Sequence, residues 1–100
     1  MSHFIRPSLR GRFTWDPKKA AANERDHGVT FDEARTVFSD PLAEYRADWE
    51  HAEARLIALG MSASERVLYV VHVELVGDTT RIISARKATR HERKRYEKGW

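Results

Sequence analysis

The segment VLYVVHVELVGDTTRIISARK, residues 67–87, decides the fold. Val67 to Leu75 is almost continuously apolar, as expected for a central strand that is covered on both faces. Gly77-Asp78 has the composition of a two-residue hairpin turn, and Thr79 to Lys87 then forms the return strand. The segment therefore predicts an antiparallel hairpin at the centre of a sheet.

A two-residue turn also fixes which residues of the hairpin face one another. Glu74 would lie opposite Arg81, and His72 opposite Ile83. These residues would share one face of the sheet, whereas Arg86 would point to the other face unless a bulge intervenes. A Glu74–Arg81 pair is either a plain exposed ion pair or part of a polar site near the turn.

The sequence on both sides of the hairpin supplies clear helix boundaries. Asp16-Pro17 is a favoured helix start and Gly28 a favoured stop, and Thr30 with Glu33 forms a capping box. Thr89 with Glu92 forms another. The predicted elements are a strand over 13–15, helices over 17–27 and 31–38, strands over 42–48, 55–61, 67–75 and 79–87, and a helix over 90–98. Gly60 marks a bulge or a close approach in its strand.

This order, β-α-α-β-β-β-β-α, predicts one α+β domain over residues 1–100. We expect a small antiparallel sheet with two N-terminal helices and one C-terminal helix. The chain has no cysteine, which excludes disulfides, thiolate nucleophiles and cysteine zinc sites. It also lacks an 18-residue apolar run and the apolar core of a secretory signal, so we expect a cytoplasmic protein with no membrane contact.

Charge is distributed unevenly along the chain. Residues 1–19 carry five Lys and Arg against one Asp, and residues 81–100 carry eight against two Glu. Residues 20–80 carry five basic and twelve acidic side chains. Two basic ends around an acidic middle indicate an anionic partner, with nucleic acid the first candidate, although a charged terminal helix can also simply be solvated.

Cations stand at two helix starts, where the helix dipole normally favours acidic residues. Either Asp16 and Glu92 offset this cost and the cations point into water, or both turns hold phosphates. The predicted phosphate- or RNA-binding residues are Lys18, Lys87, Arg90, His91 and Arg93.

Familiar catalytic motifs are missing. None of the five histidines has the spacing of a metal site, and the sequence contains no P-loop, no GxGxxG and no nucleophile elbow. We therefore expect neither a metal nor a cofactor. Arg, Lys, His, Glu and Tyr remain available, and these suffice for metal-independent RNA cleavage, in which the substrate's own 2′-OH is the nucleophile.

Three segments, taken together, resemble the BrnT family of ribonuclease toxins of type II toxin–antitoxin systems. They are WDPKKAAANERDHGVTFDEA (15–34), FSDPLA (38–43) and RIISARKATRHERKRYE (81–97), and the resemblance covers about residues 13–97. It implies a RelE-like fold and an RNA endonuclease that inhibits translation. It also implies a BrnA-like antitoxin that neutralises the toxin, carries the contact with operator DNA, and assembles as an antitoxin dimer with a toxin dimer.

The resemblance also implies roles for particular residues. Asn23 and Thr89 would bond to backbone, and Tyr96 would anchor a helix. For the chemistry we expect Arg81 and Arg86 on the phosphate, with Lys19 and His27 near it. Glu74 or His72 would accept the proton. The family pattern lends weight to Lys19, Asn23, His27, Glu53, Arg55, Glu74, Arg81, Ser84, Arg86, Thr89, Glu92, Arg93 and Tyr96.

The two proton acceptors differ in how well they suit the task. An ordinary histidine titrates near pH ~6.5 and can act as acid or base at neutral pH. A neighbouring Arg81 would lower the pKa of Glu74, which favours His72.

The chain departs from the family pattern in its central strand. Where the family reads close to VVYTER, this chain has Val71-His72-Val73-Glu74-Leu75, and Met61 stands where arginine is frequent. The alternative function is therefore a catalytically weakened BrnT-like binding module, acting mainly as antitoxin partner and co-repressor. A free DNA-binding regulator is disfavoured because no helix-turn-helix spacing is present.

Overall fold

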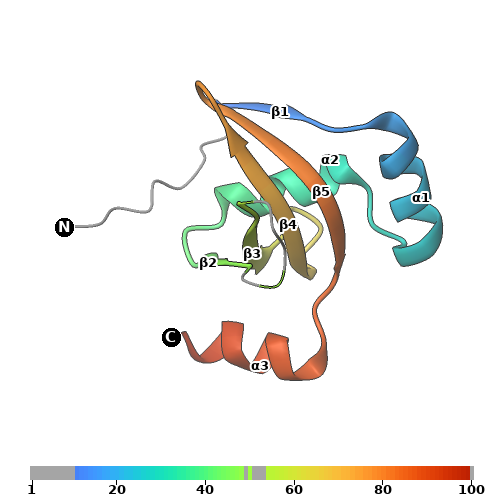
Figure 1. The fold of residues 1–100 in the computed structure, drawn as a ribbon. Coiled ribbons are helices and arrows are strands. Elements are labelled where there is room, and N and C mark those ends of the chain that lie inside the picture. Colours follow the sequence, from blue (N-terminus) through green and yellow to red (C-terminus); the bar gives the residue numbers. More distant parts are fainter. Residues whose placement is uncertain (1–10, 49, 51–53, 100) are drawn as a thin grey trace.

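The computed structural model of the chain describes residues 11–48, 50 and 54–99 (Figure 1). One five-stranded sheet, in the order β1-β5-β4-β3-β2, organises the molecule. The elements are β1 (Arg12–Thr14), α1 (Pro17–His27), α2 (Phe31–Arg35), the 3-10 helix η1 (Thr36–Ser39), β2 (Glu44–Ala47), β3 (Leu56–Met61), β4 (Val67–Leu75), β5 (Thr79–Lys87) and α3 (Arg90–Lys98).

The predicted bounds of α1, β4, β5 and α3 are confirmed. For α1 the helix caps explain the agreement: Asp16 accepts from the backbone N–H of Lys18, and Gly28 ends α1 in the left-handed conformation, with φ 67°. The predicted helix over 31–38 is α-helical only to Arg35 and continues as η1. Thr30 caps it as expected. The reciprocal half of that capping box is replaced, because the Glu33 carboxylate bonds to Arg66 and Ser62.

The prediction of an entirely antiparallel sheet is wrong at one edge. β1 pairs parallel to β5, with Arg12 opposite Thr79 and Thr14 opposite Arg81. β1 is the first element of the chain, before the two N-terminal helices, and it joins the sheet beside the last strand, β5 (Figure 1). The remaining three pairings are antiparallel.

The predicted hairpin register is also wrong in the part of the hairpin next to the turn. Leu75 pairs with Thr79, so three residues rather than two connect the strands, with Gly77 at φ 75°. Glu74 therefore lies opposite Thr80, not Arg81. An irregularity between Val71 and His72 restores the predicted register in the part of the hairpin away from the turn.

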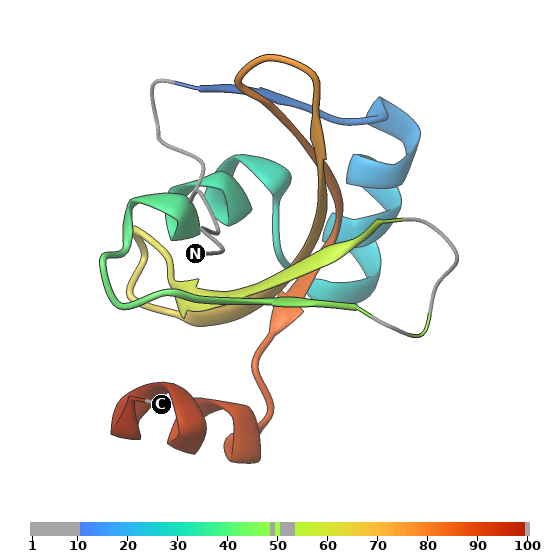
Figure 2. The same ribbon diagram turned by 60° about the vertical axis from the view of Figure 1, so that its left-hand side comes forward.

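The two faces of the sheet are covered differently. We call the side under α2 and η1 the inner face and the side towards α3 the outer face (Figures 1 and 2). The inner face is packed against Phe31 and Phe38 and forms the main core. The outer face has a second, smaller cluster under α3. The residues of this smaller cluster are Leu59, Val67, Ala88, Tyr96 and Tyr69.

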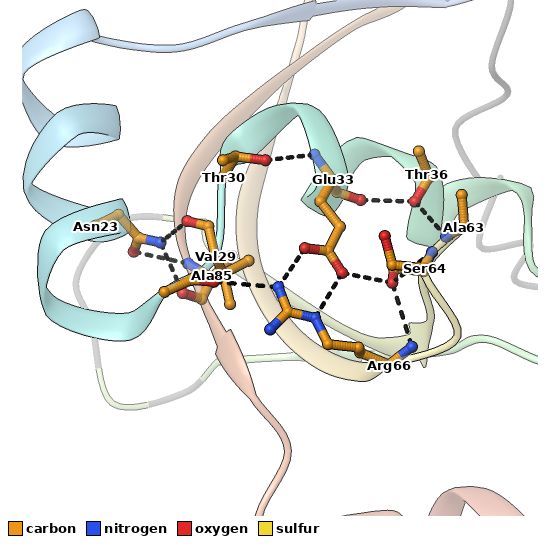
Figure 3. Close-up of polar contacts among 11 residues, drawn as sticks. Asn23, Val29, Thr30, Glu33, Thr36, Ala63, Ser64, Arg66 and Ala85 are labelled. Carbon is orange, nitrogen blue, oxygen red and sulfur yellow. Dashed lines mark hydrogen bonds and ion pairs between the residues drawn. The ribbon is translucent and has the colours of Figure 1, made fainter.

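Side-chain amide and carboxylate groups tie the helices to the sheet (Figure 3). The Asn23 amide donates to the carbonyls of Val29 and Ala85 at 2.9 and 2.8 Å and accepts from the Ala85 N–H at 3.1 Å. It thus joins α1 to β5 where β1 has ended. Hydrogen bonds from Arg66 lower the pKa of Glu33, and the two side chains fasten α2 to the start of β4. The predicted backbone-bonding role of Asn23 is confirmed.

Gly60 is the close approach that the sequence suggested. A Cβ at this position would lie 2.8 Å from Ala43 Cβ and 2.8 Å from Val37 Cγ1. β3 can therefore pass under η1 only with glycine there.

Candidate functional site

A cleft of about 420 Å³ lies between the outer face and α3. We call it the α3 cleft. Ile57 and Leu59, both 5% exposed, form an apolar part of its wall on β3. Charged and aromatic side chains from three strands and from α3 complete it. The full lining is Glu44, Tyr45, Arg46, Ile57, Leu59, Tyr69, Glu92 and Arg95.

Arg86 stands beside this cleft in a fixed orientation. Its guanidinium lies 3.9 Å from the centre of the Tyr69 ring and donates to both carboxylate oxygens of Glu92, at 2.8 and 3.1 Å. Glu92 Oε1 also accepts from the Thr89 N–H, which completes the predicted capping box. Burial alone would raise the pKa of Glu92, but hydrogen bonds from Arg86 and Thr89 outweigh it and lower the pKa.

Glu44 and two arginines form the other polar part of the cleft. Glu44 and Arg46 are two residues apart on β2, so their side chains are on the same face of the strand. Burial raises the pKa of Glu44, although the charges of Arg95 and Arg46 oppose the shift. A carboxylate with a raised pKa beside arginines can exchange a proton while an anion is held nearby.

α3 is held over the cleft by its predicted anchor, Tyr96. The Tyr96 hydroxyl donates to Asp40 Oδ2 at 2.5 Å, and the same oxygen accepts from the Met61 N–H at 2.8 Å. Burial, together with this bond to Asp40, raises the pKa of Tyr96 to about 12. One carboxylate therefore links the end of η1, the end of β3 and α3.

Arg86 is the predicted catalytic residue that the structure places next to the cleft. Four of the predicted phosphate-binding residues are exposed where β5 leads into α3. These are Lys87, Arg90, His91 and Arg93.

The other predicted residues lie elsewhere. Arg81 is exposed opposite Val73, so it is on the outer face, whereas Glu74 opposite Thr80 is on the side of the inner face. The expected Glu74–Arg81 pair is thus ruled out by the three-residue connection. Lys18, Lys19 and His27 are exposed on α1, which packs along β5 rather than over the cleft (Figure 1).

His72 lies in the inner core. Its side chain is 0% exposed, and its ring meets Phe38 edge-on with centroids 4.9 Å apart. Within the described part of the chain neither ring nitrogen makes a hydrogen bond of ordinary geometry, and the backbone of Val70 opposes the effect of burial to a smaller extent. Burial lowers the pKa of His72 to about 4. This placement argues against His72 as the group that takes a proton from a bound substrate, since no substrate reaches it.

Sequence reasoning missed Glu44, Arg46, Tyr69 and Arg95. A signal for two of them was present: the alternation Glu44-Tyr45-Arg46-Ala47 is the pattern of a half-buried strand with a polar face. Arg95 and Tyr69 gave no comparable signal, because only the packing of α3 across the outer face brings them together. Glu53, which the family resemblance favoured, lies outside the described residues.

Across 11–48, 50 and 54–99, no group of three or more His, Asp or Glu side chains is arranged to hold a metal ion. None of the helices in that part of the chain has the length and apolar character needed to span a membrane.

Comparison with known proteins identifies the family to which this chain belongs. A family model for the ribonuclease toxin BrnT of type II toxin–antitoxin systems matches residues 15–92. The 1.1 Å crystal structure of the Brucella abortus ribonuclease toxin BrnT is similar with a TM-score of 0.65 and 23% sequence identity, covering 80% of this chain and 99% of that one. At this identity the similarity establishes the fold. No curated protein matches the sequence. The chain belongs to the BrnT family of ribonuclease toxins of type II toxin–antitoxin systems.

Proposed function

We propose that this toxin is a metal-independent endoribonuclease that cleaves RNA in the α3 cleft and thereby inhibits translation. The observation that carries the proposal is the joint presence of Arg46, Arg95 and the raised-pKa carboxyl of Glu44 in one cleft. Arg86 is fixed at its border by Tyr69 and Glu92.

The proposed reaction needs only these groups and the substrate. The RNA 2′-OH loses its proton to the Glu44 carboxylate, and its oxygen attacks the adjacent phosphorus. The O2′–P bond forms as the P–O5′ bond breaks, which leaves a 2′,3′-cyclic phosphate and a 5′-hydroxyl. The 5′-oxygen takes its proton from water or from the acid form of Glu44. Arg46 and Arg95 stabilise the extra negative charge on the crowded phosphate.

The remaining predicted site residues take supporting roles in this proposal. Arg90, His91 and Arg93 bind neighbouring phosphates along α3, where they are exposed. Lys87, which lies opposite Leu68 on the side of the inner face, would contact a more distant part of the RNA. Lys18, Lys19 and His27 on α1, and Arg81 near the hairpin, would contact more distant parts of a long RNA. His72 contributes through the core.

The partner we propose is a BrnA-like antitoxin in the cytoplasm, assembled as an antitoxin dimer with two toxin chains. The antitoxin would carry the contact with operator DNA. Its acidic segments would find a complementary surface on α3, where Arg90, Arg93, Lys94 and Lys98 are exposed. We also propose, from the family resemblance, that the fold is RelE-like.

The Arg86–Glu92 pair favours a second candidate function. Both terminal nitrogens of Arg86 already bond to Glu92, so this arginine fastens α3 and has less charge to offer a phosphate. A chain in which Arg86 is structural could be the weakened binding module, which keeps the antitoxin interface and cleaves RNA poorly.

A cleavage assay separates the two candidates. Purified chain, free of antitoxin, is incubated in excess EDTA with a single-stranded RNA and with the same sequence made as DNA. We expect cleavage of the RNA alone, with 2′,3′-cyclic phosphate ends. Arg46→Ala and Glu44→Gln should each lower the rate about 10²-fold, as the loss of one transition-state contact does.

Arg81→Ala is the matched control, because Arg81 is an exposed arginine on the same face outside the cleft. Its rate should stay within about threefold of the parent, since a distant phosphate contact contributes little to the transition state. Equal loss in Arg81→Ala and Arg46→Ala would move the site to the hairpin. A parent chain that folds, binds antitoxin and leaves both naked and ribosome-bound RNA intact would establish the binding module.

A further inference from the structure

The part of the outer face next to the hairpin turn carries an aliphatic strip outside the cluster under α3. We call it the β4 strip, and its residues are Val71, Val73 and Leu75, every second residue of one strand. Val71 and Val73 are half-buried, and Leu75 is 42% exposed. Among the described residues, the cluster under α3 does not include them. Contiguous apolar side chains that are open to solvent indicate a surface that another molecule covers.

Two arginines flank the β4 strip on the side of β5 and β1. Arg81 on β5 is opposite Val73. Arg12 on β1 is opposite Thr79, which is in turn opposite Leu75. Both arginines are exposed. Neighbouring strands are about 4.8 Å apart, so the two Cα atoms lie about 5 and 10 Å to the side of the strip. β1, β4 and β5 are described in full, and none of their acidic residues is on the outer face.

The topology indicates what kind of element would cover this surface. β4 and β5 are interior strands of the sheet, so a partner cannot extend the sheet there and has to lie on its face. A helix is the usual layer on such a face, as α3 is at the other end. The strip spans about 13 Å, four residues at 3.3 Å each, which matches about nine residues of helix at 1.5 Å each. A helix about 10 Å across would bring one flank over both arginines.

Charge and side-chain type decide which partner fits. A second copy of the chain would bring arginines against arginines, which repel one another. Single-stranded RNA stacks its bases on aromatic side chains, and the β4 strip has only aliphatic ones. A helix with an apolar stripe and carboxylates along its flank complements both the strip and the arginines. Membership of a toxin–antitoxin family gives this chain an antitoxin as partner.

We propose that the β4 strip, together with Arg12 and Arg81, binds an acidic amphipathic helix of the antitoxin. The antitoxin thus supplies a second outer helix beside α3. Its apolar residues cover the strip, and its carboxylates pair with the two arginines. This inference deepens the partner assignment of the proposed function and depends neither on RNA cleavage nor on the α3 cleft.

Calorimetric titration of the full chain with synthetic peptides tests this chemistry. The probe is a helical peptide of about 14 residues, held by a side-chain lactam, with leucines at i, i+3, i+4 and i+7 and glutamates on both flanks. A second peptide has lysines in place of the glutamates. We expect the glutamate peptide to bind with a dissociation constant of about 10–100 μM, more weakly as salt is added, and the lysine peptide not to bind.

Two matched pairs of variants locate the binding. Leu75→Asp should weaken binding of the glutamate peptide about tenfold or more, because the helix would bury the new carboxylate. Val76→Asp places the same charge one residue away, on a side chain that is 101% exposed, and should leave the affinity within about threefold. Arg81→Glu should weaken the glutamate peptide about tenfold and let the lysine peptide bind. Arg25→Glu, at an exposed arginine on α1, should do neither.

The toxin–antitoxin complex, purified from cells that express both genes together, tests which molecule covers the strip. The glutamate peptide should not bind this complex, because the antitoxin helix is already in place. A peptide that binds the complex as well as it binds free toxin overturns the proposal. So does the absence of binding to free toxin, or an equal loss in Leu75→Asp and Val76→Asp. Binding of an RNA oligonucleotide, but not of the peptide, that is lost in Leu75→Asp would assign the strip to RNA instead. None of these measurements uses RNA cleavage, so their outcome is independent of the proposed reaction.

Discussion

The two faces of the five-stranded sheet differ in how completely other elements cover them. The inner face is closed: α2 and η1 cover it, and Leu68, Val70 and Ile82 on its strands are at most 1% exposed. The outer face is half open: α3 covers one end, and the α3 cleft brings Glu44, Arg46 and Arg95 to solvent. The inner face therefore supplies the stability, and the outer face is free to carry charge.

The comparison also explains how each face treats an ionisable group. His72 on the inner face has lost its water and is held neutral, whereas Glu92 on the outer face keeps its charge through hydrogen bonds from Arg86 and Thr89. The two groups differ in both depth and partners: burial dominates at His72, whereas hydrogen bonds outweigh burial at Glu92. If this division is correct, inner variants should change global stability and outer variants should change α3 or activity with little global effect.

Replacing Asn23 should produce the largest loss. Asn23→Ala leaves Val29 C=O and both backbone groups of Ala85 without their hydrogen bonds in a buried place, which should lower the free energy of unfolding by about 4 kcal/mol. Urea denaturation measures it, with exposed Glu24→Ala as the neighbouring control. A loss no larger than that of the control would remove Asn23 from the inner framework.

Acid should unfold the chain through His72. The pKa of His72 is about 4 in the folded chain against about 6.5 when unfolded, so the unfolded chain binds the proton first as pH falls. Stability present above pH 6.5 is lost progressively down to pH 4, by about 3 kcal/mol in total. His72→Phe removes this proton, so its denaturation midpoint should depend less on pH across that window. Parallel pH curves for the two proteins would contradict the burial of His72.

The tight passage of β3 under η1 should respond to one methyl group. Gly60→Ala would bring a Cβ within 2.8 Å of Ala43 and Val37, and overpacking of this kind costs about 2 kcal/mol. Thermal unfolding measures the shift. A second variant, Gly60→Ala with Val37→Ala, makes room at one contact and should recover part of the loss. No recovery would mean that Ala43 alone sets the limit.

The smallest expected effect belongs to the outer face. Tyr96→Phe removes the hydroxyl bond to Asp40 and should cost about 1 kcal/mol. Hydrogen exchange should accelerate in residues 90–98 and stay unchanged in β4 and β5, because α3 opens without the sheet. Uniform acceleration through the whole chain would erase the distinction between the two faces.

Sequence reasoning succeeded wherever a local signal was complete. The caps at Asp16, Thr30 and Thr89 fixed helix starts, and the family motif indicated the roles of Asn23 and Tyr96. It failed at the hairpin because Gly77-Asp78 matches a two-residue turn equally well, and one added residue reverses which side chains share a face. This one-residue difference places Arg81 and Glu74 on opposite faces of the sheet.

The candidate site was less accessible to prediction than the fold. A cleft formed by α3 crossing the outer face depends on long-range packing, which no local pattern around Arg95 or Tyr69 encodes. His72 was expected to accept a proton because an ordinary histidine titrates near neutral pH. Its actual position follows from the packing of Phe38 and Tyr45 around it.

The Asn23 amide has a consequence beyond holding α1 in place. β1 leaves β5 after Arg81, and the backbone of Ala85 would otherwise present an open N–H and C=O to any extended peptide. The amide occupies both groups as a neighbouring strand would, so this stretch cannot seed the sheet-to-sheet growth that leads to aggregates. The Asn23 side chain thus lowers the tendency of the toxin to aggregate when no antitoxin is bound.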